Sequence, residues 1–130
     1  RAVRRRRRAV RLPRLVDPPV SSADPWQAIH VAVNRTFPHV LDQEAALNEP
    51  LEPSEALELT TALEAYTSGS AWQLRLEQDY GRIAPGAIAN ITVANRNPYD
   101  DIESGQPAMI CTTSNMLTIE CGRIVYDARW

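Results

Sequence analysis

Asp17 is the side chain in this sequence best suited to chemistry. It lies within the stretch L-V-D-P-P-V, residues 15–20. An aspartate can accept and release a proton during a reaction, or ligate a metal ion. The stretch is equally typical of an ordinary turn, because an aspartate before proline often starts one. The residues next to Asp17 leave both interpretations open.

The histidines and cysteines do not form a recognisable site. His30 falls within a helical pattern that has no second metal ligand one turn away, and His39 lies in a polar loop. Both are interpreted as packed or surface residues. Cys111 and Cys121 are too few for a disulfide framework and have no histidine nearby for a metal site. Cys121 is interpreted as a small buried or turn residue, not a nucleophile.

A helix is expected directly after the Asp17 stretch. Asp24 is a good N-cap and Pro25 a good first helical residue. Apolar residues at helical spacing then continue the pattern through Asn34. Residues 36–53 are polar and acidic, and prolines interrupt them, so they predict a loop.

Further helices are expected up to the middle of the chain. Ser54 can cap a short helix that runs through Leu59. Thr60 or Thr61 can cap the next helix, since Thr61 has the spacing of a capping box. A third helix is expected to end at about Gln78.

The stretch Y-G-R-I-A-P-G-A-I-A-N-I-T-V, residues 80–93, separates these helices from short strands. Gly81 and Gly86 supply the backbone freedom that a change of direction needs. Pro85 before Gly86 predicts a reverse turn. The apolar, partly β-branched run that follows predicts a strand at residues 90–94.

A loop and a hairpin are expected beyond this strand. Turn signals predict a polar loop at residues 95–106. Strands are predicted at residues 108–113, 116–120 and 123–127. The turn between the last two strands is expected to contain two residues, Cys121 and Gly122. It predicts three cross-strand pairs, which are Glu120 with Arg123, Ile119 with Ile124 and Leu117 with Tyr126.

Length and charge limit the class of protein. The 130 residues suffice for one domain, but a complete barrel of eight strand–helix units typically needs roughly 250. Residues 1–14 hold eight of the 14 basic residues and predict a disordered arm. An arm that binds nucleic acid or an anionic membrane is the alternative, but no aromatic residue is interleaved for stacking. The acidic remainder argues against nucleic acid as the partner.

Nothing in the sequence indicates a membrane protein. No stretch is long and apolar enough to span a bilayer, and no apolar core follows the N-terminal charges as in a signal peptide. The expected location is the cytoplasm.

Several motifs resemble those of the amidohydrolase superfamily. The pattern G-x-I-x-P-G-x-x-A-x-x-x-V, residues 81–93, resembles the signature G-x-[LI]-x-P-G-x-x-A-D-x-V-V, with Asn90 in place of the aspartate. Residues 15–20 resemble G-S-D-x-P-V, which places Asp17 on the catalytic aspartate of the family. Residues 24–35 and 62–72 resemble the helices that follow, and residues 118–127 resemble the end of these enzymes. The subgroup with the Ser-Asp-x-Pro-Val signature, which includes N-substituted formamide deformylase-like enzymes, is the most similar.

The resemblance implies a fold and a division of the chain. The fold class is α+β, a C-terminal fragment of a (β/α)8 barrel followed by strands of the accompanying small β-sandwich. Residues 1–14 are the Arg-rich arm. Residues 15–83 are the end of the last barrel strand and the C-terminal helices, and residues 84–130 are the sandwich strands.

The resemblance also implies a function. Such enzymes use a divalent metal, usually zinc, to activate water against amide-type C–N bonds of small molecules. Asp17 would ligate the metal and transfer the proton from the water to the leaving amine. The remaining metal ligands of the family precede this segment, so the chain alone is expected to be inactive and to bind no metal tightly. Exposed apolar faces would favour self-association. The alternative is a non-catalytic binding or regulatory module derived from the same fold.

Overall fold

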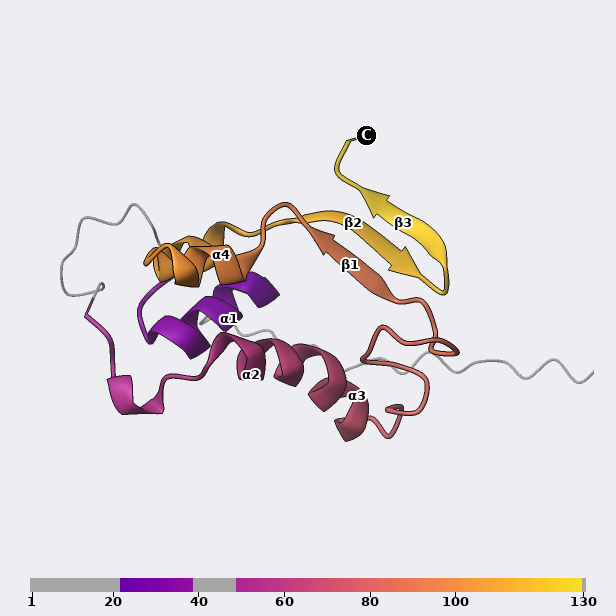
Figure 1. Ribbon diagram of the computed structural model, residues 1–130, viewed down its shortest axis with the longest axis horizontal. Helices are drawn as coiled ribbons and strands as arrows, with labels where there is room; N and C mark the ends of the chain where they lie inside the picture. The colour runs from indigo at the N-terminus through magenta and orange to yellow at the C-terminus, as the bar shows by residue number, and fades with distance from the viewer. Residues whose placement is uncertain (1–21, 39–48, 130) are drawn as a thin grey trace, which may run out of the picture.

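The computed structural model describes residues 22–38 and 49–129, which form an α+β arrangement as expected. A group of helices occupies one side, and a three-stranded antiparallel sheet extends from it (Figure 1). The predicted arm, Asp17 and His39 lie outside the described residues. None of the helices in the described ranges is long and apolar enough to cross a membrane.

Helix α1, Pro25–Asn34, confirms the first predicted helix. The carboxylate of Asp24 accepts the backbone N–H of Trp26 at 2.9 Å, and Pro25 needs no N–H partner at this position. The helix ends where Arg35 takes a left-handed conformation with φ 57° and its N–H bonds to Val31 O. Both ends are therefore fixed by local sequence.

The next helices differ from the prediction. Instead of a helix from Ser54 to Leu59 there is a single 3-10 turn, η2, Pro53–Glu55. The backbone N–H of Leu57 donates to Ala32 O at 2.9 Å, which holds the chain extended against α1. Helix α2, Leu59–Glu64, therefore begins after Glu58, and neither Thr60 nor Thr61 caps it.

Helix α2 continues without a break through a π-helical segment, η3, Ala65–Gly69, into α3, Ser70–Gln73 (Figure 1). The predicted extension to Gln78 is wrong. Arg75 adopts a left-handed φ of 57°, and the N–H of Leu76 bonds back to Ala71 O at 2.9 Å. A left-handed residue followed by this backbone hydrogen bond is a common way for a helix to end.

The joint between helices and strands follows the prediction. Gly81 and Gly86 have φ values of 84° and 87°, which glycine adopts without strain. The N–H of Ala87 bonds to Ala84 O at 3.1 Å, so a reverse turn with Pro85 and Gly86 at its centre is confirmed.

The sheet consists of β1 Ile91–Ala94, β2 Asn115–Glu120 and β3 Arg123–Asp127, in the order β1-β2-β3. The predicted hairpin turn is confirmed, because the residues that flank it pair as expected. The third predicted pair is wrong. The register is irregular between Thr118 and Ile119, so that Tyr126 pairs with Thr118 instead of Leu117. The observed pairs between β2 and β3 include Glu120 with Arg123 and Ile119 with Ile124.

The predicted polar loop and the strand after it are both helical. Helix α4, Pro98–Glu103, starts where Asn97 Oδ1 accepts the N–H of Tyr99 at 3.2 Å. A 3-10 helix, η4, Pro107–Thr112, replaces the predicted strand at residues 108–113. Its β-like composition is overridden by packing, because Ile110 is 0 % exposed against α1.

The core lies among the helices and not under the sheet. Ile29, Leu59, Ala62 and Ile110 form the buried cluster, which joins α1, α2 and η4. No residue of β1, β2 or β3 is buried. The sheet therefore contributes no buried residue to this core.

Candidate functional site

The helix that follows Asp17 is anchored to the sheet. Asp17 itself lies outside the described residues, but α1 is the first described element after it. The indole Nε1–H of Trp26 donates to Asn115 Oδ1 at 2.9 Å, which ties the first turn of α1 to the first residue of β2. The predicted catalytic residue therefore precedes a helix with a fixed start.

His30 is 1 % exposed and is held by hydrogen bonds on both ring nitrogens. Nε2 is 3.1 Å from Thr36 Oγ1, and Nδ1 is 3.0 Å from Asn34 Nδ2. The same Asn34 nitrogen donates to the backbone O of Pro107 at 2.9 Å. This agrees with the interpretation of His30 as a packed residue.

Burial lowers the pKa of His30 below its ordinary value of 6.5, because a charged imidazole loses its hydration in the interior. Backbone hydrogen bonding at Phe37 and Ala108 acts in the opposite direction and is the smaller effect. The neutral ring is therefore favoured in the folded chain.

The described residues do not fit the metal site that the resemblance implies. Within residues 22–38 and 49–129 no group of three or more His, Cys, Asp and Glu side chains could hold a metal ion. Both nitrogens of His30 already have partners, and the carboxylate of Asp101 is paired with Arg96.

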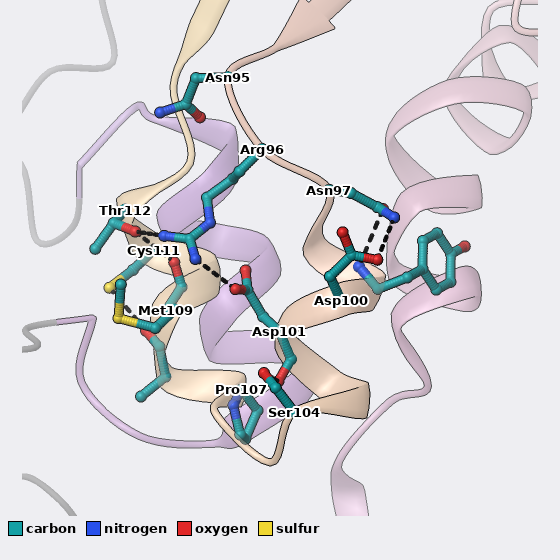
Figure 2. A network of polar contacts seen from close by, with 12 residues as sticks. Asn95, Arg96, Asn97, Asp100, Asp101, Ser104, Pro107, Met109, Cys111 and Thr112 are labelled. Carbon is teal, nitrogen blue, oxygen red and sulfur yellow. Dashed lines mark hydrogen bonds and ion pairs between the residues drawn. The ribbon is translucent and has the colours of Figure 1, made fainter.

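Sequence reasoning missed a polar cluster around Arg96. Figure 2 shows the guanidinium between α4 and η4, where it donates to Asp101 Oδ1 at 2.5 Å and to Thr112 Oγ1 at 2.6 Å. Thr112 Oγ1 in turn donates to Met109 O at 2.7 Å. The cluster joins the chain after β1 to both helical segments.

Asp101 is the buried member of this cluster, at 5 % exposure. Its Oδ2 and the Nε of Arg96 have no hydrogen-bond partner within the described part of the chain. The sequence does hold a signal for α4, because Asn97 is a good N-cap and Pro98 a good first helical residue. Recognising α4 would have placed Asp101 in its first turn.

An open groove of about 730 Å³ lies between the helix at residues 59–73 and β1. Much of its lining is apolar, including Trp26, Leu63 and Ile91. The hydroxyl of Ser70, which also lines it, donates to Ala65 O at 2.8 Å within the helix. The groove offers an apolar surface and does not bring a nucleophile together with a base.

Comparison with known proteins includes residues that the structure does not describe, among them Asp17. The model of the Amidohydrolase family matches residues 6–126, which include Asp17. A protein of Bacillus subtilis (strain 168) named "Putative amidohydrolase YtcJ" is 32 % identical over 111 residues. The aligned region covers 85 % of this chain and 19 % of that protein.

No solved structure matches the chain. The chain spans about a fifth of the length of the curated relative. The family match covers nearly all of the chain, from before the predicted catalytic aspartate to Tyr126 in β3. The chain therefore belongs to the amidohydrolase family.

Proposed function

We propose that this chain is the C-terminal part of a metal-dependent hydrolase that cleaves amide-type C–N bonds in small molecules. The observation that carries the proposal is the family match over residues 6–126. The Bacillus subtilis relative, whose name describes an amidohydrolase, supports it. The Ser-Asp-x-Pro-Val signature, which residues 15–20 match in part, makes the formamide deformylase-like subgroup our first choice within the family.

The proposed division of the chain follows the change from helices to sheet. Residues 15–83 would be the end of the last barrel strand and the C-terminal helices, and residues 84–130 would be strands of a small β-sandwich. The order of elements supports this, because α1 to α3 precede the joint and all three strands follow it. Residues 1–14 would be an arm outside both parts.

Asp17 is the proposed proton shuttle. Hydrolysis of an amide requires the attacking water to lose a proton and the leaving nitrogen to gain one. A carboxylate beside the scissile bond can accept the first proton and deliver it to the nitrogen. A divalent metal, zinc in our proposal, would supply Lewis-acid activation when bound. Apart from Asp17, its ligands are assigned to a part of the enzyme that this chain does not include.

The test uses the longer enzyme and two matched substitutions. In Asp17→Asn the amide cannot shuttle a proton, so kcat on a panel of N-substituted formamides should fall by about 10²- to 10⁴-fold. Asp79→Asn, an equally conservative change at an exposed position, should leave kcat unchanged. Equal activity of the two variants would contradict the role of Asp17.

The isolated chain provides a second readout. Calorimetric titration with zinc should detect no submicromolar site, because one carboxylate is too few for tight binding. A submicromolar site that disappears in Asp17→Ala would overturn the proposal that this chain is inactive alone.

A non-catalytic binding or regulatory module is the second candidate. The groove of about 730 Å³ beside β1 favours it, because its apolar lining suits a ligand or a partner segment. Activity of the longer enzyme that depends on Asp17 would exclude this alternative.

A further inference from the structure

His30 and Asn34 connect α1 to η4 through a chain of hydrogen bonds. The amide nitrogen of Asn34 lies 3.0 Å from His30 Nδ1 and 2.9 Å from Pro107 O. Pro107 is the first residue of η4, whereas His30 and Asn34 lie on α1. This amide is therefore a polar link between two elements that otherwise meet through apolar side chains such as Ile29 and Ile110.

The carbonyl of Pro107 fixes the direction of each hydrogen bond in this series, from Pro107 through Asn34 and His30 to Thr36. A carbonyl oxygen only accepts, so the atom of Asn34 that faces it must be the amide nitrogen. That nitrogen can only donate, so His30 Nδ1 must accept. The proton of the neutral ring is then on Nε2, which donates to Thr36 Oγ1 at 3.1 Å. Only the neutral Nε2–H tautomer satisfies all three contacts.

We propose that His30 and Asn34 form an acid-sensitive latch, in which a proton on His30 Nδ1 places two donors face to face and breaks at least one of the two contacts of Asn34. Rotation of the Asn34 amide would accept the new proton on Oδ1, but it would turn oxygen toward the Pro107 carbonyl. Protonation therefore cannot leave both contacts of Asn34 intact. The expected result is a loosened contact between α1 and η4 with the sheet unchanged.

Nearby charges do not account for the behaviour of the latch. On α1 the charged side chains are the cap, Asp24, and Arg35 at the C-cap, whose Nε donates to Leu51 O. On α2, Glu64 is exposed, and η4 carries only the thiol of Cys111, which donates to Ala108 O. Asp101 on the neighbouring α4 is paired with Arg96.

The direction of the pH effect follows from the depressed pKa of His30 in the folded chain. Burial is the main cause of the lowered pKa, and it favours the neutral ring. The open state has an ordinary histidine with a pKa of 6.5 and binds a proton first as the pH falls. Opening should therefore increase below pH 6.5, by up to about tenfold per pH unit, until the folded pKa is reached.

Amide hydrogen exchange, expressed as protection factors, tests the proposal in the intact chain. The reporters are the N–H of Arg35, bonded to Val31 O, and the N–H of Thr113, bonded to Ile110 O. The reference is the N–H of Ala128, bonded to Met116 O beside the sheet. Between pH 6.5 and 5.5, protection at Arg35 and Thr113 should fall, by at most about fivefold, while Ala128 keeps its value. A parallel fall at all three amides, or no fall, would overturn the latch.

Two histidine variants separate the latch from general acid effects. His30→Asn keeps an acceptor at the Nδ1 position but does not titrate, so the pH dependence should disappear. His39→Asn removes the other histidine and should behave like the native chain. Loss of the pH dependence in His39→Asn, or its persistence in His30→Asn, would refute the proposal.

The ring nitrogens of His30 provide a measurement that needs no variant. At pH 7 their ¹⁵N chemical shifts should report a neutral ring with the proton on Nε2. A ring protonated on Nδ1 at this pH would contradict the geometry on which the latch depends.

Discussion

At the scale of single residues, the carboxylate of Asp101 depends on one guanidinium. Arg96 holds it between α4 and η4, and the side chains of the pair are 7 % and 29 % exposed for Asp101 and Arg96. Asp101→Ala would leave the partly buried charge of Arg96 without its carboxylate partner. A fully buried pair costs about 3–5 kcal/mol when one member is removed, and the exposure of Arg96 reduces this to about 2 kcal/mol. Urea unfolding at pH 7 measures the loss.

Asp100→Ala is the matched control for Asp101. Asp100 is exposed, and its carboxylate accepts a hydrogen bond from Asn97 Nδ2 at 2.8 Å. Its removal should cost about 0.5 kcal/mol, typical of surface contacts. Equal losses in the two variants would show that Asp101 does not hold the helices together.

Some residue roles were predictable because their partners are close in sequence. Asp24 caps the helix that begins next to it, and the capped N–H belongs to Trp26. His30 was interpreted as packed, but its link to Pro107 depends on a contact across 73 or more positions that no local pattern records. The role proposed for Asp17 rests on family resemblance and stays a prediction.

At the scale of elements, local sequence signals predicted the structure correctly where packing between distant segments did not oppose them. The reverse turn at residues 84–87 and the two-residue hairpin turn at Cys121 and Gly122 each contain a glycine with positive φ, Gly86 and Gly122. Residues 108–113 have strand-like composition but fold as η4, because Ile110 is buried against α1. A local sequence pattern does not report contacts with distant residues, so η4 could not be predicted from its own residues.

The backbone at Gly81 lies close to the helical residues of η3 and α3. A Cβ added there would lie 2.8 Å from Ala71 Cβ and from Ser68 Cα, and 2.9 Å from Thr67 O. The segment can follow the helix closely only because position 81 has no side chain. Gly81→Ala should therefore destabilise the chain through both the clash and the positive φ, by about 3 kcal/mol.

Gly86→Ala isolates the cost of the backbone conformation. Gly86 has a similar φ of 87° but no atom within 4 Å of an added Cβ. Its substitution should cost about 1 kcal/mol from φ alone. Thermal unfolding of both variants gives the difference, and a Gly86→Ala loss as large as that of Gly81→Ala would contradict a close approach to the helix.

At the scale of the whole molecule, the sheet is the part with the least cover. Ile91, Ile119 and Ile124 pair directly across the three strands, so their side chains share one face. None of them is buried, and Ile124 is 62 % exposed. Each of the two strand pairings contains a register irregularity, which makes edge-to-edge pairing unfavourable. The face, rather than an edge, is therefore the surface through which we expect the isolated chain to self-associate.

Ile124→Lys tests this expectation by placing a charge on the sheet face. Burying an isoleucine contributes about 1.5–3 kcal/mol, so the dissociation constant of the self-associated form should rise by roughly tenfold or more. Leu51→Lys is the matched control, because Leu51 is 71 % exposed and lies outside the sheet. Sedimentation velocity over a range of concentrations measures both variants. A native chain that is monomeric throughout, or equal weakening by the two substitutions, would show that the sheet face does not drive association.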